Sequence, residues 1–308
     1  MTTEAKAPEL TLGPVLFNWS AERWRDFYFR IADEAPIGTV YLGEAICSKR
    51  APLFAPYCET VAARLEAAGK AVVLSTLAEV TVKQDRRLVE DICSAPARPI
   101  EANDASALLR LYGQPHHVGP FMNAYNERTL SVLARAGARN VCLPAEIPAR
   151  AVAALCRAAA PLGVEIEVQV FGRVSLALSA RCYHARAHGR TKDSCQFVCE
   201  NDPDGMVLTT LEGAPFLAVN GIQTMSYPFL NLLGALSDLR AMGVARFRLS
   251  PQTCDMVEVA LLFRRVLDRR IEADEAMNRL SALLPGTPFA NGFYHGKPGH
   301  LWHSAPSE

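Results

Sequence analysis

Residues 39–76, TVYLGEAICSKRAPLFAPYCETVAARLEAAGKAVVLST, have the pattern of one complete strand–helix–strand unit. The apolar run 39–45 has the length of a strand, and 71–76 is a second run of the same kind. Between them, apolar residues recur at helical spacing over 56–69, and Gly69 suits the end of a helix. Two strands joined by a crossover helix favour a parallel βαβ arrangement.

The same alternation extends over most of the chain. About eight strands alternate with helices, so we predict a single-domain, (β/α)8-type, TIM-like barrel over 1–308, complete or lacking one unit. A doubly wound open sheet is the second choice, and the chain from about residue 286 looks irregular. The other predicted strands are 15–19, 99–102, 140–144, 165–171, 216–220 and 246–250, with one more beginning at 117, and the other helices include 21–32, 106–112, 127–137, 148–162, 226–242 and 255–268.

Composition narrows the possible functions. The 308 residues carry 32 Lys and Arg against 32 Asp and Glu, which argues against a surface that grips DNA through its phosphates. We read no secretory signal and no apolar span long enough for a transmembrane helix. Nine cysteines without an export signal indicate a reducing cytoplasm, where thiols serve metals or cores rather than disulfides.

Residues 179–199 hold three cysteines in a short polar segment with few core-building side chains. Cys195 and Cys199 are four residues apart, so on a helical turn they would point the same way, and Cys182 lies upstream. Converging thiolates make a soft-metal site. Zinc usually takes paired cysteines two residues apart, whereas iron–sulfur clusters accept irregular spacings, so we favour a cluster over zinc or three structural cysteines.

The barrel prediction supplies a fourth thiol. Functional residues of such barrels follow the C-terminal ends of strands, the position of Glu44 and Cys47 after the strand 39–45. The cysteine segment follows the strand 165–171, so Cys47 is the natural fourth ligand from across the barrel mouth. Three other residues near strand ends are candidates for lining a pocket: Glu101, Asn123 and Glu146.

The runs 167–182, EVQVFGRVSLALSARC, and 193–199, DSCQFVC, resemble the signature of the collagenase-like peptidase family, whose catalytic type is unassigned. That family typically has four cysteines here, and Ser175 stands where the first would fall. The stretch 41–50, YLGEAICSKR, is similar to the matching stretch in the branch of this family that takes part in oxygen-independent ubiquinone biosynthesis. The similarity includes the displaced fourth cysteine, Cys47. The stretches 12–16, 73–78, 219–226 and 248–252 also resemble that branch.

The resemblance implies a [4Fe–4S] cluster with Cys47, Cys182, Cys195 and Cys199 as its ligands. It implies a heterodimer with a UbiU-like subunit that supports hydroxylation of the ubiquinone ring without O2, with prephenate as the oxygen donor. A sterol-carrier-like lipid-binding protein is an implied accessory partner. Relatives in the wider family hydroxylate RNA bases.

Other residues around the cysteines have weaker claims to a role. Glu44 and Arg181 are candidates for contacting the cysteine ligands rather than the iron. Four thiolates would leave no iron of the cluster free to bind a substrate, which favours a role as an electron relay or a scaffold. The sequence does not identify which residues are catalytic. An RNA-base hydroxylation factor, a peptidase and a zinc-stabilised scaffold are the alternatives, although the chain has neither an H-E-x-x-H nor a G-x-S-x-G motif. The remaining cysteines, Cys58, Cys93, Cys142, Cys156 and Cys254, are predicted to be core residues.

Overall fold

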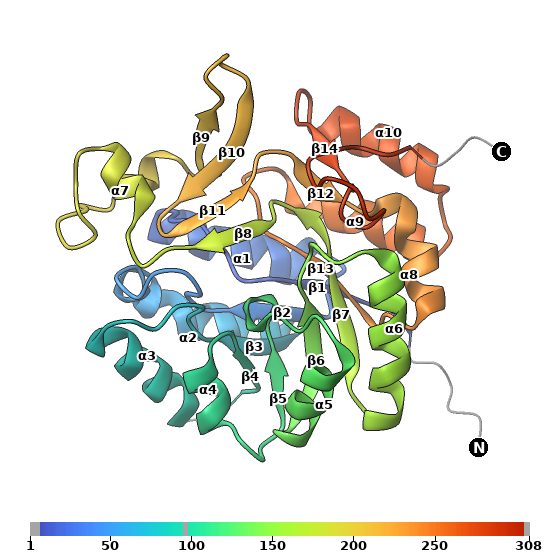
Figure 1. The fold of residues 1–308 in the computed structure, drawn as a ribbon, viewed down its shortest axis with the longest axis horizontal. Coiled ribbons are helices and arrows are strands. Elements are labelled where there is room, and N and C mark those ends of the chain that lie inside the picture. Colours follow the sequence, from blue (N-terminus) through green and yellow to red (C-terminus); the bar gives the residue numbers. More distant parts are fainter. Residues whose placement is uncertain (1–6, 95–97, 305–308) are drawn as a thin grey trace.

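The computed structural model describes residues 7–94 and 98–304. Its central feature is a closed barrel of parallel strands in the order β13-β1-β2-β3-β4-β5-β6-β7, and β7 pairs with β13 to complete the ring (Figure 1). Closure confirms the barrel prediction and excludes an open sheet. The barrel strands are β1 (Glu9–Leu12), β2 (Thr39–Leu42), β3 (Ala71–Ser75), β4 (Ile100–Ala102), β5 (His116–Val118), β6 (Ala138–Leu143), β7 (Glu165–Gly172) and β13 (Arg246–Leu249).

Helices follow the strands and cover the outside of the barrel (Figure 1). The first of them shows why they form where they do: Ser20 caps its N-terminus by accepting a hydrogen bond from the backbone of Arg23, and Trp24, Tyr28 and Ile31 share its buried face. These helices are α1 (Ala21–Glu34), α2 (Ala51–Ala67), α3 (Lys83–Ser94), α4 (Ala105–Arg110), α5 (Glu127–Arg135), α6 (Ala149–Ala159), α8 (Leu236–Met242), α9 (Met256–Leu267) and α10 (Ala273–Leu283).

A long insertion separates β7 from the last barrel strand, β13. It contains an antiparallel sheet in the order β8-β11-β10-β9, and with α7 it lies at one side of the barrel (Figure 1). The 3-10 helix η3 joins α7 to this sheet, and β12 pairs antiparallel with β7. The elements of the insertion are β8 (Ser175–Leu178), α7 (Tyr183–Ala187), η3 (Val198–Asn201), β9 (Met206–Thr209), β10 (Pro215–Asn220), β11 (Gln223–Ser226) and β12 (Phe229–Asn231).

The first strand was predicted in the wrong place. The segment 15–19 is a buried loop, and β1 lies just before it. Its backbone is satisfied by side chains rather than by a neighbouring strand: the N–H of Val15 donates to the Tyr28 hydroxyl, and the carbonyl of Leu16 accepts from Arg50 and Gln223. The run of apolar side chains at 15–19 therefore gave the pattern of a strand, although the segment has no strand partner.

Two further predictions, both in the insertion, were confirmed only in part. The strand 216–220 exists as β10, but it belongs to the antiparallel sheet and not to the barrel. The helix predicted over 226–242 begins only at α8, because β12 occupies its first part. The chain after residue 286, expected to be irregular, contains the two-residue strand β14 (Phe289–Ala290), which pairs with β12. Among the residues that the structure describes, no helix combines the length and apolarity needed to cross a membrane.

Candidate functional site

Four cysteines line one small cavity between the β2–α2 loop and the β7–β13 insertion. Cys47 comes from the loop after β2, Cys182 caps the N-terminus of α7, Cys195 lies in the loop after α7, and Cys199 is in η3. All four are free thiols. The structure therefore brings together the four residues that the sequence singled out, although they are up to 152 positions apart in the chain (199 − 47).

The turn between Cys195 and Cys199 is not the predicted helical turn. Gln196 and Phe197 adopt left-handed backbone angles, with φ of 48° and 54°. Such angles are unusual for residues other than glycine, and they concentrate at functional sites. Here they reverse the chain so that both sulfur atoms face the same cavity.

Glu44 fixes the loop that carries Cys47. Its buried carboxylate accepts hydrogen bonds from the backbone N–H groups of Ile46 at 2.7 Å and Cys47 at 2.9 Å. Burial raises the pKa of Glu44, partly opposed by the positive charge of Arg50. Glu44 thus orients the backbone beside one thiol and does not itself line the cavity.

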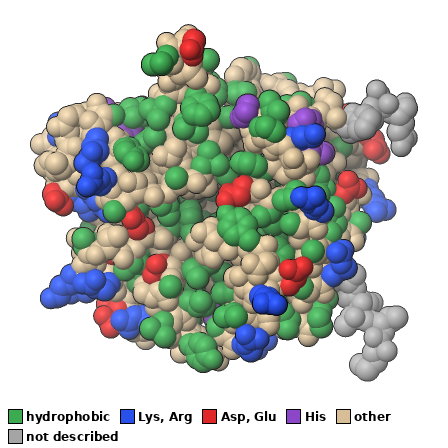
Figure 2. Space-filling view, viewed as in Figure 1, with side chains coloured by type: hydrophobic (Ala, Val, Ile, Leu, Met, Phe, Trp, Pro, Cys, Tyr) green, Lys and Arg blue, Asp and Glu red, His purple; other side chains and the backbone are tan. Residues whose placement is uncertain are grey.

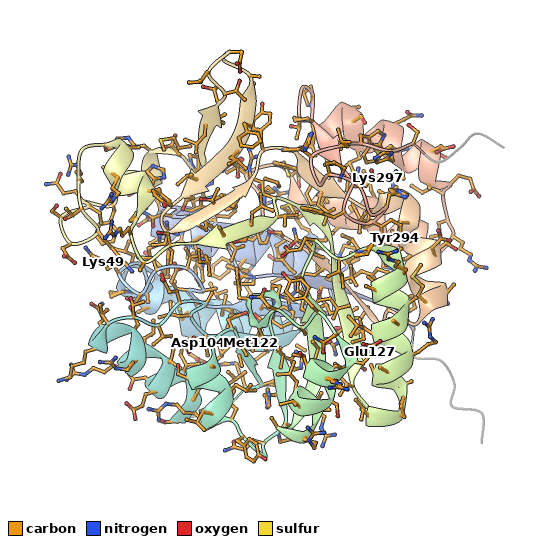
Figure 3. All side chains as sticks on the ribbon, viewed as in Figure 1. Lys49, Asp104, Met122, Glu127, Tyr294 and Lys297 are labelled. Carbon is orange, nitrogen blue, oxygen red and sulfur yellow. The ribbon has the colours of Figure 1, made fainter. Side chains whose placement is uncertain are left out.

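Two cations from the same loop stand next to the sulfur atoms. Lys49 Nζ lies 3.6 Å from Cys195 Sγ and donates to the backbone carbonyls of Lys192 and Asp193 in the loop after α7 (Figure 3). Arg50 is fully buried and also lines the cavity. Burial alone would lower the pKa of Arg50, but the adjacent Cys199 and Glu44 raise it overall.

Arg50 is held in place by the insertion. Its Nη2 donates to Asn220 at 2.6 Å, and Asn220 in turn donates to the backbone carbonyl of Cys199 at 3.2 Å. A side chain at Gly221 would meet Nη2 of Arg50 at 2.5 Å, so only glycine leaves room for this arginine. The Nε of Arg50 is buried without a hydrogen-bond partner, which leaves one donor for a group in the cavity.

The other predicted residues lie as follows. Arg181 is exposed and is not among the residues that line the thiol cavity, whereas Lys192 is. Cys142 and Cys156 are buried in the core, and the remaining three cysteines are half-buried and packed against it.

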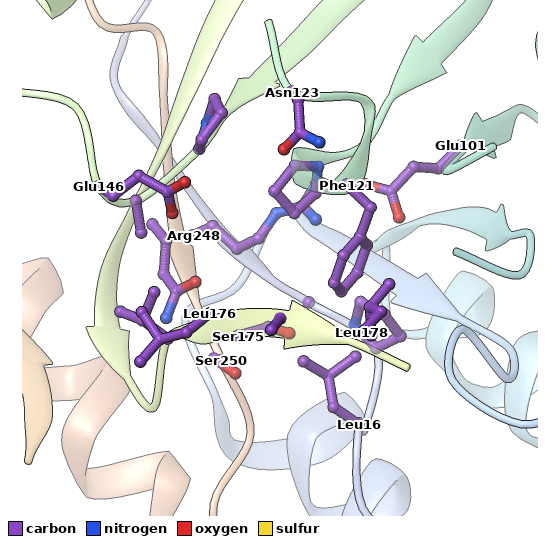
Figure 4. A pocket seen from close by; sticks show the side chains of 18 residues that line it. Leu16, Glu101, Phe121, Asn123, Glu146, Ser175, Leu176, Leu178, Arg248 and Ser250 are labelled. Atoms are coloured by element: carbon purple, nitrogen blue, oxygen red, sulfur yellow. Dashed lines mark hydrogen bonds and ion pairs between the residues drawn. The ribbon is translucent and has the colours of Figure 1, made fainter. Parts of the chain in front are cut away.

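A second cavity, of about 200 Å3, opens at the C-terminal mouth of the barrel (Figure 4). Glu101, Asn123 and Glu146 all line it, as the sequence predicted. Arg248 and Ser250 reach it from the end of β13, and β8 closes one side with apolar side chains. The pocket combines polar groups that could orient a ligand with apolar walls, the usual composition of a small-molecule site.

Arg248 lies at the base of this pocket and pairs with two buried glutamates. Its Nη2 is 2.6 Å from Glu101 Oε1 and 3.0 Å from Glu167 Oε2, and its guanidinium stacks 3.9 Å from the ring centroid of Tyr41. Tyr41 and Asn140 each donate to Glu167 at 2.7 Å. The network is almost completely shielded from solvent and joins five barrel strands.

These contacts set the ionisation of Glu167. Burial opposes the charged carboxylate, but the charge and hydrogen bonds of Arg248, with hydrogen bonds from Thr11 and Tyr41, lower its pKa from 4.5 to about 2. Glu167 therefore stays negatively charged inside the barrel at neutral pH.

Acid should weaken the fold through Glu167. A carboxyl whose pKa is lowered by folding stabilises the protein above its unfolded pKa and loses that contribution as pH falls toward its folded pKa. Between about pH 5 and pH 2, we expect about 3 kcal/mol of stability to disappear from this group. Urea unfolding over this range should show a shallower pH slope in Glu167→Gln, with exposed Glu22→Gln as the control, and an unchanged slope would contradict the assignment.

The mouth pocket and one of the four cysteines contact the same apolar cluster. Leu16, Phe121 and Leu178 line the mouth pocket, and the same three side chains pack against the apolar cluster that contains Cys182. Cys182 and Ala185 of that cluster line the thiol cavity, so the cluster lies between the two cavities.

Arg50 was not identified as part of the site from the sequence. It follows Cys47 by three residues, so it had a positional signal. That signal does not distinguish a buried arginine from an exposed one, because the partners of Arg50 come from distant segments.

Comparison with known proteins gives a family and distant structural similarities. The model of peptidase family U32 matches residues 19–304. The spore cortex-lytic enzyme SleL from Bacillus cereus is 9% identical, with 87% of this chain and 75% of that chain covered and a TM-score of 0.44. Phospho-2-dehydro-3-deoxyheptonate aldolase from Thermotoga maritima is 12% identical, with 91% and 71% covered and a TM-score of 0.41. Similarities this distant carry no argument about chemistry, whereas the family match spans nearly the whole chain. The chain belongs to peptidase family U32.

Proposed function

We propose that this chain is a UbiV-type subunit that holds a [4Fe–4S] cluster through Cys47, Cys182, Cys195 and Cys199. With a UbiU-like partner it would support O2-independent hydroxylation in ubiquinone biosynthesis, in the reducing cytoplasm. The observation that carries the proposal is the convergence of four free thiols on one cavity. Cysteine thiolates are the ordinary ligands of such clusters.

The spacing of the thiols favours a cluster over zinc. Zinc–sulfur bonds of about 2.3 Å would bring four sulfurs to within roughly 4 Å of one another. In the described part of the chain, the one group of three metal-binding side chains whose ligand atoms all lie within 4.8 Å contains no cysteine. Ligands spread more widely suit a group of several atoms.

The charges around the cavity also fit a cluster. Four thiolates and a cluster together carry negative charge, and Lys49 and Arg50 place two cations beside them. The free Nε–H of Arg50 would donate to a sulfur atom. These donors would stabilise the reduced form of the cluster and so raise the reduction potential of the cluster.

A bound cluster would supply electron transfer. The chain's own contribution would be to hold it beside the apolar cluster against which Leu16, Phe121 and Leu178 of the mouth pocket also pack. That arrangement supports a relay to a molecule in the pocket without exposing the thiols to it.

The pocket favours a neutral ring over an anion. Arg248 is already paired with Glu101 and Glu167, and Glu146 adds a further carboxylate at the rim. Together they leave an excess of negative charge, which would repel a dianion such as prephenate. We therefore place the phenolic ring here and the proposed oxygen donor on the partner. The view in Figure 2, where basic and acidic side chains are interspersed, offers no broad basic face for RNA.

Anaerobic cells test the function directly. Cells without this chain should lose ubiquinone when grown without O2 and accumulate the unhydroxylated prenylated ring. The wild-type chain and Cys156→Ala, a buried core cysteine on α6, should restore ubiquinone, whereas Cys199→Ala should not. Normal ubiquinone in cells that lack the chain would refute the proposed pathway, and rescue by Cys199→Ala would refute the role of the cluster.

A further inference from the structure

A second set of metal-binding side chains lies at the two ends of the cysteine loop. His184 is in α7, His188 follows its last turn, and Asp202 follows η3. One ligand atom from each of the three lies within 4.8 Å of the others. His184 is fully buried and Asp202 half-buried, whereas His188 is exposed and leaves the group open to solvent.

Backbone contacts orient both imidazoles in the same way. Nδ1 of His184 is 3.1 Å from the carbonyl of Val219, and Nδ1 of His188 is 3.0 Å from the carbonyl of His184. Because a carbonyl can only accept, each Nδ1 must carry the proton. Each neutral ring then presents an unprotonated Nε2, the arrangement that backbone carbonyls impose on metal-binding histidines.

The contact between His184 and Asp202 lacks a cation. Nε2 of His184 lies 2.9 Å from Oδ2 of Asp202, yet it has no partner with hydrogen-bond geometry. A lone pair and a carboxylate oxygen this close repel each other unless a proton or a metal ion lies between them. His184 is fully buried and Asp202 is half-buried, so water screens the repulsion only in part.

We propose that His184, His188 and Asp202 bind a divalent transition metal ion, of which zinc is the simplest probe. Two imidazoles and one carboxylate suit zinc and its neighbours, and none of these donors is a thiol of the proposed cluster. The two histidine rings now stack at 5.3 Å with an angle of 6° between their planes. A small shift of the exposed His188 toward His184 would bring the two Nε2 atoms to one ion.

The ion would join the two ends of the loop that carries Cys195. His184 and His188 precede that loop and Asp202 follows it, so one ion would clamp 188–202 into a closed ring. Closing a loop in this way removes conformational freedom from it. The site goes beyond the proposed function, because it would stabilise this loop whatever the four thiols hold.

Zinc binding to the purified protein, whose iron content is measured in the same sample, tests this site. Equilibrium dialysis should give one zinc ion fewer per chain in His188→Ala and Asp202→Asn than in the wild type. His295→Ala, which removes another exposed imidazole, should bind as much zinc as the wild type. Zinc should raise the thermal midpoint of the wild type but not of His188→Ala. X-ray absorption should show only nitrogen and oxygen ligands, at about 2.0–2.2 Å.

Equal zinc binding by the wild type and both site variants would overturn the proposal, as would sulfur ligands at about 2.3 Å. Failure of the wild type to bind zinc would also overturn it and would leave a plain imidazolium–carboxylate pair. Because His188 is exposed, its replacement leaves the core intact, which far-ultraviolet circular dichroism checks. Zinc is counted separately from iron and sulfide, so failure here is distinguishable from failure of the cluster.

Discussion

Replacing Arg248 by leucine should lower the free energy of unfolding by about 3–5 kcal/mol. The substitution removes the only cation that pairs with Glu101 and Glu167 in the described structure and leaves both carboxylates buried in the barrel. Buried charge without a partner is far more costly than a lost surface pair. Urea unfolding at pH 7 measures the change.

Arg279→Leu provides the comparison for Arg248→Leu. Arg279 pairs with Glu275 on the exposed face of α10, where both side chains are 51% accessible, and its loss should cost at most about 0.5 kcal/mol. Adding Glu101→Gln to Arg248→Leu should restore part of the stability, because one unpaired charge disappears. A loss below about 1 kcal/mol in Arg248→Leu would contradict the account of the barrel interior.

Replacing Cys47 by alanine should reduce the iron content by at least about tenfold, since even losing a group that orients a ligand costs about 10–100-fold in metal affinity. Three thiols would remain, and one iron would have no protein ligand. Cys47 is the most informative of the four cysteines because it alone comes from outside the insertion. Iron and sulfide analysis after anaerobic isolation measures the loss.

Cys58→Ala is the matched control for Cys47. Both cysteines are half-buried and follow the same barrel strand, but Cys58 packs against the core on α2 and does not line the thiol cavity. Its iron content should equal that of the wild type. Full iron in Cys47→Ala, or an equal loss in both variants, would exclude Cys47 as a specific ligand.

The sequence predicted the barrel correctly where an apolar strand is followed along the chain by the helix that packs against it. The spacing of apolar residues between 39 and 76 predicted a strand, a helix and a second strand. The two strands are present as β2 and β3, which pair in parallel. The prediction failed at 15–19, where Tyr28, Arg50 and Gln223 satisfy the backbone of a buried loop. Such long-range partners leave no local pattern.

At the candidate site, too, local sequence patterns were predictive and long-range contacts were not. Cys47 could be placed beside the insertion because the carboxyl ends of parallel strands meet at one end of a barrel. The antiparallel sheet could not be foreseen, since β10 has the same apolar character as a barrel strand. Without that sheet, neither the anchoring of Arg50 by Asn220 nor the apolar cluster between the two cavities could be derived.

Iron, sulfide and zinc analysis of the anaerobically purified protein, together with its visible spectrum, tests the central claim most directly. We expect about four irons and four sulfides per chain, with a brown colour that dithionite bleaches. Zinc without sulfide in the cavity of the four thiols would contradict it. The barrel would stand, but the chain would then be a zinc-stabilised module rather than a redox subunit.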